Sequence, residues 1–185
     1  MSEPVKTGAF RKSHKQDAFE HPDFYQLDDL FTEEQKMVRA TARQFVKKEV
    51  SPYIEEWAQH AHFPYEIVKK FGEVGAFGPT IPTAYGGGGL DYISYGLLMQ
   101  EIERGDSGMR STASVQGSLV MYPIYKFGSE EQRKKYLPKL ASGEWLGCFG
   151  LTEPDHGSYP SGMVTNFKDK GDHYLLNGAK MWISN

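Results

Sequence analysis

The spacing of apolar residues changes once along this chain, near Trp145. From about residue 28 to that point, apolar side chains recur at every third or fourth position, which is the spacing of one face of an α-helix. After it, the period drops to two and glycine becomes frequent, as in β-strands joined by tight turns. The sequence therefore predicts an α+β chain in which helices come first and antiparallel strands follow.

This change and the start of the helical periodicity near residue 28 divide the chain into three parts. Residues 1–27 show no periodicity and are expected to form an extended lead-in. Residues 28–143 are expected to form an all-helical domain, and residues 144–185 the start of an antiparallel β domain. The last predicted strand stops at Asn185 with no turn and no partner, so we expect this β domain to be incomplete.

Two copies of one capping motif mark the starts of helices. "TEEQ" begins at Thr32 and "SEEQ" at Ser129, and each places a hydroxyl at the N-cap with Gln three residues later. A further helix is expected from Asp91 to Arg104. Pro138 is expected to help end the last helix.

Two features predict strands near the end of the chain. Asn177 and Gly178 separate two strand-like runs, and this pair is the strongest short-range signal for a hairpin turn. The apolar run "LGCFGL" is predicted to form a buried strand, in which Cys148 would be a packed side chain.

Composition excludes several classes of function. The net charge of -3, with both signs scattered along the chain, offers no basic surface for a nucleic acid. The apolar runs are far shorter than the roughly 20 residues that span a membrane, so we expect a soluble protein without membrane insertion. The only histidine spacing typical of metal ligands is "HAH", at His60 and His62, without carboxylate or thiolate neighbours, so no metal site is expected.

The segment "GCFGLTEPDHGS", residues 147–158, is a candidate ligand-binding turn. Gly157 can adopt positive φ, neighbouring backbone N–H groups can then converge, and Ser158 adds a hydroxyl donor. The same residue types suit an ordinary polar hairpin loop. Residue chemistry alone leaves both interpretations open.

Together with "KMWISN" at residues 180–185, this segment resembles the pair of flavin-binding segments of the acyl-CoA dehydrogenases. The resemblance implies FAD as cofactor, with Thr152 at the flavin edge and Gly157 and Ser158 contacting cofactor phosphate and substrate. Trp182 would flank the ring, and Ser184 would donate the hydrogen bond of the Thr that the family often has. The resemblance also implies cofactor contacts for Phe149, Leu151 and Ile183.

Within that family, the stretch "LLMQEIERGDSGMRSTASVQGSLVMYPIYKFGSEEQRKKYLPKL" resembles glutaryl-CoA dehydrogenases. The resemblance implies that Glu103, Arg110 and Ser111 line a pocket for the distal carboxylate of the substrate, with Ser158 also near the substrate. A guanidinium suits this role because it donates two parallel hydrogen bonds to a carboxylate. Glu103 would repel that carboxylate unless both share Arg110 or a water, so it would orient the Arg or tune the decarboxylation. Without the resemblance, Arg110 and Glu103 suit a surface ion pair.

The reaction that the resemblance implies is the oxidation of glutaryl-CoA to crotonyl-CoA and CO₂. Electrons would pass to electron-transfer flavoprotein, and the enzyme would be a homotetramer that acts in lysine and tryptophan degradation. It would lie in the cytoplasm of a bacterium, which we favour, or in the mitochondrial matrix of a eukaryote. The family's catalytic base is a Glu in a C-terminal helical domain, expected beyond Asn185, so no residue here is assigned as the base.

One residue departs from the family pattern, because Tyr159 follows Ser158 where the family commonly has Asp. Two alternatives also stay open. The enzyme could act on another acyl-CoA, or the chain could be a non-catalytic module that keeps a partial flavin or CoA surface or serves as a helical interaction domain. We expect residues 1–185 alone to hold flavin poorly and to be inactive.

Overall fold

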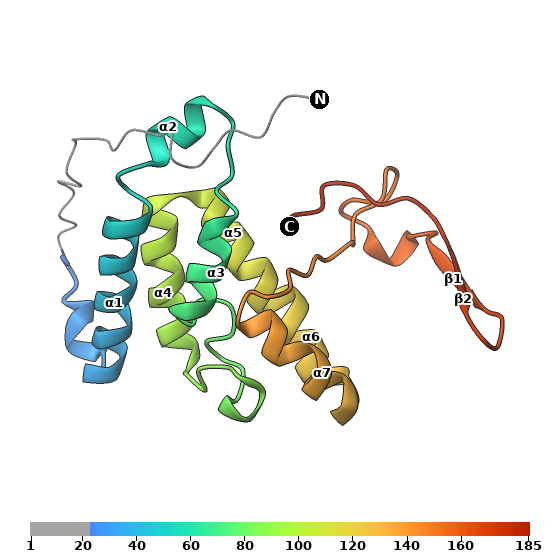
Figure 1. Ribbon diagram of the computed structural model, residues 1–185, viewed down its shortest axis with the longest axis horizontal. Helices are drawn as coiled ribbons and strands as arrows, with labels where there is room; N and C mark the ends of the chain where they lie inside the picture. Colours follow the sequence, from blue (N-terminus) through green and yellow to red (C-terminus); the bar gives the residue numbers. More distant parts are fainter. Residues whose placement is uncertain (1–22) are drawn as a thin grey trace.

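The computed structural model describes residues 23–185, so most of the predicted lead-in lies outside the described residues. Figure 1 shows a cluster of helices from which the chain leaves after α7, runs out to a two-stranded hairpin and returns toward the helices. We call residues 27–141 the helical cluster and residues 144–185 the C-terminal arm. Along the described residues no helix is long and apolar enough to cross a bilayer.

The elements follow one another in the order that the periodicity predicts. In chain order they are the 3₁₀ turn η2 (Leu27–Leu30), α1 (Glu33–Glu49), α2 (Ile54–Gln59), α3 (Glu66–Glu73), the 3₁₀ turn η3 (Thr83–Tyr85), α4 (Tyr92–Gly105), α5 (Ser107–Ser114), the π-helix η4 (Val115–Met121), α6 (Tyr122–Phe127), α7 (Glu130–Ala141), the 3₁₀ turn η5 (Pro160–Gly162), β1 (Asn166–Asp169) and β2 (Tyr174–Asn177).

Both predicted capping boxes are confirmed. At the start of α1, the Gln35 N–H donates to Thr32 Oγ1 at 3.2 Å and the Thr32 N–H donates to Gln35 Oε1 at 3.0 Å. At the start of α7, the Gln132 N–H donates to Ser129 Oγ at 3.2 Å and the Ser129 N–H donates to Gln132 Oε1 at 2.8 Å. Each box satisfies backbone donors that the first helical turn leaves unpaired.

The predicted start of α4 at Asp91 is also confirmed, because the Asp91 carboxylate accepts the Ser94 N–H at 2.7 Å. The prediction for Pro138 was wrong, since α7 continues through it to Ala141. Leu137 and Leu140 flank the proline and are buried in the core, so packing holds the last turn although one backbone donor is missing.

The core of the helical cluster is aromatic and aliphatic. Phe71 of α3 meets Phe77 edge to face at 5.8 Å between ring centroids, and both side chains are fully buried. Helices α1 and α4 approach closely because Gly105 has no side chain: a Cβ there would lie 2.7 Å from Cγ1 of Val46.

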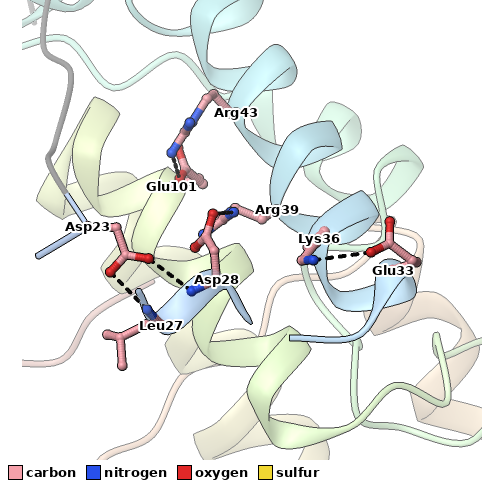
Figure 2. Close-up of polar contacts among 8 residues, drawn as sticks. All are labelled: Asp23, Leu27, Asp28, Glu33, Lys36, Arg39, Arg43 and Glu101. Atoms are coloured by element: carbon pink, nitrogen blue, oxygen red, sulfur yellow. Dashed lines mark hydrogen bonds and ion pairs between the residues drawn. The ribbon is translucent and has the colours of Figure 1, made fainter. Parts of the chain in front are cut away.

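A buried ion pair also joins α1 and α4 (Figure 2). Arg43 donates to both carboxylate oxygens of Glu101, from Nε at 3.0 Å and from Nη2 at 2.7 Å, and the Glu101 side chain is only 2% exposed. One turn earlier on α1, Arg39 makes a second two-pronged contact, to Asp28 of η2, with both distances at 2.6 Å. Bidentate geometry fixes the relative orientation of the elements it joins.

A hairpin forms, but it is not the predicted one, whose two strands would have flanked Asn177 and Gly178. β1 and β2 are antiparallel and Asn177 pairs with Asn166, so Asn177 and Gly178 lie at the open end of the hairpin. The turn spans residues 170–173, where Gly171 has φ 93 and the Lys170 N–H donates to the His173 carbonyl at 2.9 Å. The Gly171 turn keeps β1 and β2 in a register that leaves the Asn-Gly pair outside it.

The predicted buried strand "LGCFGL" was also wrong. Residues 146–151 form no strand in the described structure, and Cys148 is exposed. β1 and β2 pair only with each other, so the run has neither a strand partner nor a second layer to pack against. The run "KMWISN" is likewise not a strand, because Trp182 has φ 58 and breaks the extended conformation.

Candidate ligand site

Glu103 and Arg110 meet where α4 gives way to α5. Asp106 ends α4 and caps α5 by accepting the Met109 N–H at 2.8 Å, so the chain turns sharply between the two side chains. Arg110 Nε donates to Glu103 Oε2 at 2.5 Å, and Ser107 Oγ donates to Glu103 Oε1 at 2.6 Å. Both contacts, that of Arg110 foremost, hold the pKa of Glu103 below its ordinary value.

Ser114 is part of this group, although the sequence reasoning missed it. Arg110 Nη1 donates to Ser114 Oγ at 3.1 Å, whereas the predicted Ser111 contributes only its carbonyl, to the Ser114 hydroxyl at 3.1 Å. The i,i+4 spacing of Arg110 and Ser114 on a helix was the signal that could have found it. Of the described residues, none accepts a hydrogen bond from Nη2 of Arg110, whose side chain is 36% exposed.

A pocket of about 230 Å³ opens farther along the same helical stretch. Its lining contains tyrosine rings and hydroxyls and no charged side chain, and consists of Pro79, Thr80, Tyr92, Tyr95, Gly117, Ser118 and Tyr122. Arg110 and Glu103 are not among these residues. The charged group and the uncharged pocket are therefore two separate features of the helix surface.

The two segments of the flavin resemblance are brought together in the C-terminal arm. The Met181 N–H donates to the Thr152 carbonyl at 3.0 Å, and Lys180 Nζ donates to the Leu151 carbonyl at 2.8 Å. A Cβ built at Gly150 would lie 3.7 Å from Cδ1 of Ile183. The segments thus run side by side without forming a strand pair.

Glu153 lies at the junction of these segments and was not predicted as a site residue. Its side chain is 2% exposed and accepts the Val164 N–H at 2.7 Å, the Thr165 N–H at 2.9 Å and Lys180 Nζ at 3.0 Å. Hydrogen bonding from Thr165 foremost, then from Val164 and Lys180, lowers the pKa of Glu153 to about 2 against the opposing effect of burial. Glu153 therefore connects three separate stretches of the arm.

The apolar residues of the two segments face solvent. Phe149 is 41% exposed, Leu151 38%, Ile183 44% and Trp182 84%. Thr152, which follows Leu151, is half-buried, and Ser184 is exposed. The two segments therefore present apolar side chains at a surface and not in a packed core.

Gly157 does not adopt the positive φ that its residue type permits. Its φ is not positive, although six other glycines of the described chain have positive φ. A Cβ at Gly157 would meet nothing within 4 Å. Gly157 and Ser158 are both exposed, and no backbone strain or close contact requires glycine there.

No three His, Cys, Asp or Glu side chains among residues 23–185 gather as metal ligands. The expectation that His60 and His62 form no metal site rested only on the residues next to them in the sequence. In the structure, His60 Nδ1 lies 2.9 Å from the Glu56 carbonyl oxygen of its own helix.

Comparison with known proteins identifies the family of the helical region. Residues 32–144 match the model of the acyl-CoA dehydrogenase N-terminal domain. A curated glutaryl-CoA dehydrogenase from Desulfococcus multivorans is 44% identical over 86% of this chain and 42% of its own length. The human mitochondrial short-chain specific acyl-CoA dehydrogenase is 39% identical over 87% of this chain and 39% of its own length.

The fold is also shared with a solved structure. The crystal structure of a glutaryl-CoA dehydrogenase from Mycobacterium smegmatis in complex with FADH2 is 48% identical with a TM-score of 0.83, over 86% of this chain and 41% of that one. The chain thus spans about two fifths of the length of these relatives. With a family model that matches more than half of its residues, the chain belongs to the acyl-CoA dehydrogenase family.

Proposed function

We propose that this chain forms part of an FAD-dependent acyl-CoA dehydrogenase whose substrate is glutaryl-CoA. The observation that carries the proposal is the arrangement of Arg110, which Glu103 and Ser114 hold at two of its nitrogens while Nη2 has no acceptor among the described residues. A guanidinium held in this way is preorganised to bind a carboxylate. Two of the similar proteins described above are glutaryl-CoA dehydrogenases.

Arg110 and its neighbours suit a dicarboxylic acyl group better than a hydrocarbon one. A hydrocarbon chain would leave Nη2 of Arg110 without an acceptor, whereas the distal carboxylate of glutaryl-CoA would accept from it. Glu103 already accepts from Arg110 and Ser107, so the incoming carboxylate would share the Arg with Glu103. In this proposal Ser111 and Ser158 also line the substrate site.

The two joined segments of the arm fit one side of a flavin. Phe149, Leu151 and Ile183 offer apolar contacts to a flat ring, Trp182 offers an indole, and the Thr152 hydroxyl lies in the same stretch. Gly157, Ser158 and Ser184 would add polar contacts to the cofactor. When bound, FAD supplies the acceptor for the hydride that leaves the substrate β carbon.

The rest of the reaction is proposed on the same basis. A base outside these residues would take the α proton of the thioester, and loss of CO₂ after oxidation would give crotonyl-CoA. Electrons would then pass to electron-transfer flavoprotein, and the enzyme would assemble as a homotetramer. These parts of the proposal rest on the resemblance to the family and not on contacts within the chain.

The test is an anaerobic titration of the FAD-loaded protein, purified as it occurs naturally, with glutaryl-CoA and, separately, with butyryl-CoA. We expect glutaryl-CoA to bleach the flavin absorbance band of the unmodified protein. In the Arg110→Met variant, the apparent affinity for glutaryl-CoA should fall by about 10- to 100-fold, because a charge-assisted bidentate contact is lost. The control is Lys134→Met, which removes an exposed positive charge from a different helix, α7.

Three outcomes would contradict parts of this proposal. A colourless protein that takes up no FAD would remove the flavoprotein assignment. Equal bleaching of the unmodified protein and Arg110→Met by glutaryl-CoA would remove the role of Arg110. Preference for butyryl-CoA in the unmodified protein would instead favour a short-chain substrate, the alternative supported by the 39% identity to the human short-chain enzyme.

A further inference from the structure

Gln116 is a fully buried polar side chain in the π-helix that follows α5. Its Nε2 donates to the Leu140 carbonyl at 2.9 Å and to the Trp145 carbonyl at 2.8 Å, and its Oε1 accepts the Gly147 N–H at 2.8 Å. Both ends of the amide are therefore bonded. Three backbone groups of the chain depend on this one side chain.

The partners of Gln116 lie where the C-terminal arm leaves the helices. Leu140 is in the last turn of α7, and Gly147 is the first residue of the segment that resembles a flavin contact. The chain approaches the π-helix so closely there that a Cβ at Gly147 would lie 2.4 Å from Cγ1 of Val120. Gln116 therefore sets the position and direction in which the arm begins.

Asn185 attaches the other segment of the arm to the same place. Its Nδ2 donates to the Gly147 carbonyl at 3.2 Å and to the Thr112 carbonyl at 3.3 Å, and Thr112 belongs to α5 beside Arg110. Two amide side chains thus connect both segments of the arm to one helical stretch. That stretch also carries Arg110 and Ser114.

We propose that Gln116 is a positioning residue that sets the distance between the carboxylate-binding Arg110 and the flavin-contacting residues of the arm. This inference rests on the proposed function. A buried amide that is hydrogen-bonded at both ends is held in one orientation, and removing it leaves two carbonyl groups and one N–H without their partner. A π-helical turn also widens the helix locally, and such turns occur frequently at functional sites.

We expect substitution of Gln116 to affect turnover much more than the binding of substrate. In Gln116→Leu, the flavin segment should shift relative to a substrate that is still anchored at Arg110, because none of the described contacts joins Gln116 to Arg110, Glu103 or Ser114. We expect kcat per bound flavin to fall by about 10- to 100-fold. The KM for glutaryl-CoA should stay within about twofold, and the flavin absorbance band should shift.

A second measurement does not depend on the identity of the substrate. Hydrogen exchange at the Gly147 amide of the FAD-loaded protein should become at least about tenfold faster in Gln116→Leu, since its acceptor is gone. Gln116→Glu keeps an acceptor oxygen for this amide and should keep most of its protection. If Gln116→Leu fails to fold, the same measurements are made on Gln116→Glu.

The control for a merely structural role is Ile67→Ala, which removes buried atoms from α3, far along the chain from both the arm and Arg110. It should lower stability but leave kcat per bound flavin and Gly147 exchange unchanged. An equal fall of kcat in Ile67→Ala, or an unchanged kcat and Gly147 exchange in Gln116→Leu, would overturn the proposal. If the unmodified protein does not oxidise glutaryl-CoA, the proposed function fails separately, and the flavin band and Gly147 exchange still decide the role of Gln116.

Discussion

The helical cluster buries mainly hydrocarbon, together with the Glu101 carboxylate beside Arg43, whereas the one buried residue of the C-terminal arm is a carboxylate. Phe71, Phe77 and Ile81 have no exposed surface in the helical cluster. Of residues 144–185, all of which the structure describes, Glu153 alone is buried, while Phe167 is 67% exposed. Both regions contain phenylalanines, but only the helical cluster buries them.

The two regions are stabilised by different interactions. In the helical cluster, stability grows with the apolar area removed from water and is shared among many contacts. In the arm, a two-stranded hairpin with no packed face is marginal by itself, so a few directional contacts to Glu153, Gln116 and Asn185 set its geometry. The two regions should therefore respond to different changes.

The largest expected effect comes from truncating matched phenylalanines in the two regions. Phe71→Ala should lower the free energy of unfolding by about 3–5 kcal/mol, because it removes a fully buried ring that contacts Phe45 and Phe77. Phe167→Ala should change it by only about 0.5 kcal/mol, although its ring also meets a tyrosine edge to face. Urea unfolding followed by circular dichroism measures both values.

A large decrease in the free energy of unfolding in Phe167→Ala would contradict the comparison, because it would mean that the arm has an apolar core in solution. A small decrease in Phe71→Ala would contradict it as well, because it would mean that the buried rings contribute little to the helical cluster. If both predictions hold, the free energy of unfolding reports on the helical cluster alone.

The next effect concerns two glycines of the arm. Gly178 has φ 150, and a Cβ there would lie 2.1 Å from Thr165 Oγ1, whereas a Cβ at Gly157 would meet nothing within 4 Å. Gly178→Ala should therefore disrupt the open end of the hairpin, at a local cost of about 1–3 kcal/mol. Gly157→Ala should cost less than about 0.5 kcal/mol.

Hydrogen exchange across β1 and β2 distinguishes the two glycine variants. Faster exchange in Gly178→Ala, with unchanged exchange in the helices, would support the view that local geometry holds the arm. Faster exchange in Gly157→Ala would contradict the structure and would return to Gly157 the special conformation that its sequence context suggested.

The elements that the sequence predicted correctly are those set by neighbours within a few residues. The capping boxes at Thr32 and Ser129 and the cap at Asp91 each join a side chain to a backbone N–H three residues later, so a short pattern contains the whole interaction. Pairing of Arg110 with Glu103 likewise crosses a single helix boundary. These contacts are readable because both partners lie in one stretch.

Gln116 and Glu153, which the sequence did not reveal, have partners far along the chain. Gln116 bonds to residues 24 to 31 positions away, and Glu153 bonds to Lys180 across 27 positions. The strand predicted around Cys148 failed for a related reason, since alternation indicates which face would be buried but not whether a partner is there. Flavin contacts by Thr152, Gly157, Ser158 and Trp182 remain predictions from resemblance.

The last expected effect is a loosening of the arm in acid. The pKa of Glu153 falls from an ordinary value of 4.5 to about 2, chiefly through hydrogen bonding from Thr165. Folding therefore favours the ionised carboxylate, and its contribution is complete above about pH 4.5 and is lost as the pH falls toward about 2. Exchange of the Val164 and Thr165 amides, corrected for intrinsic pH dependence, should lose protection over this range. Glu153→Gln should abolish the step, and equal loss of protection at Phe71 or persistence of the step in that variant would contradict the assignment, because the helical cluster does not depend on this carboxylate.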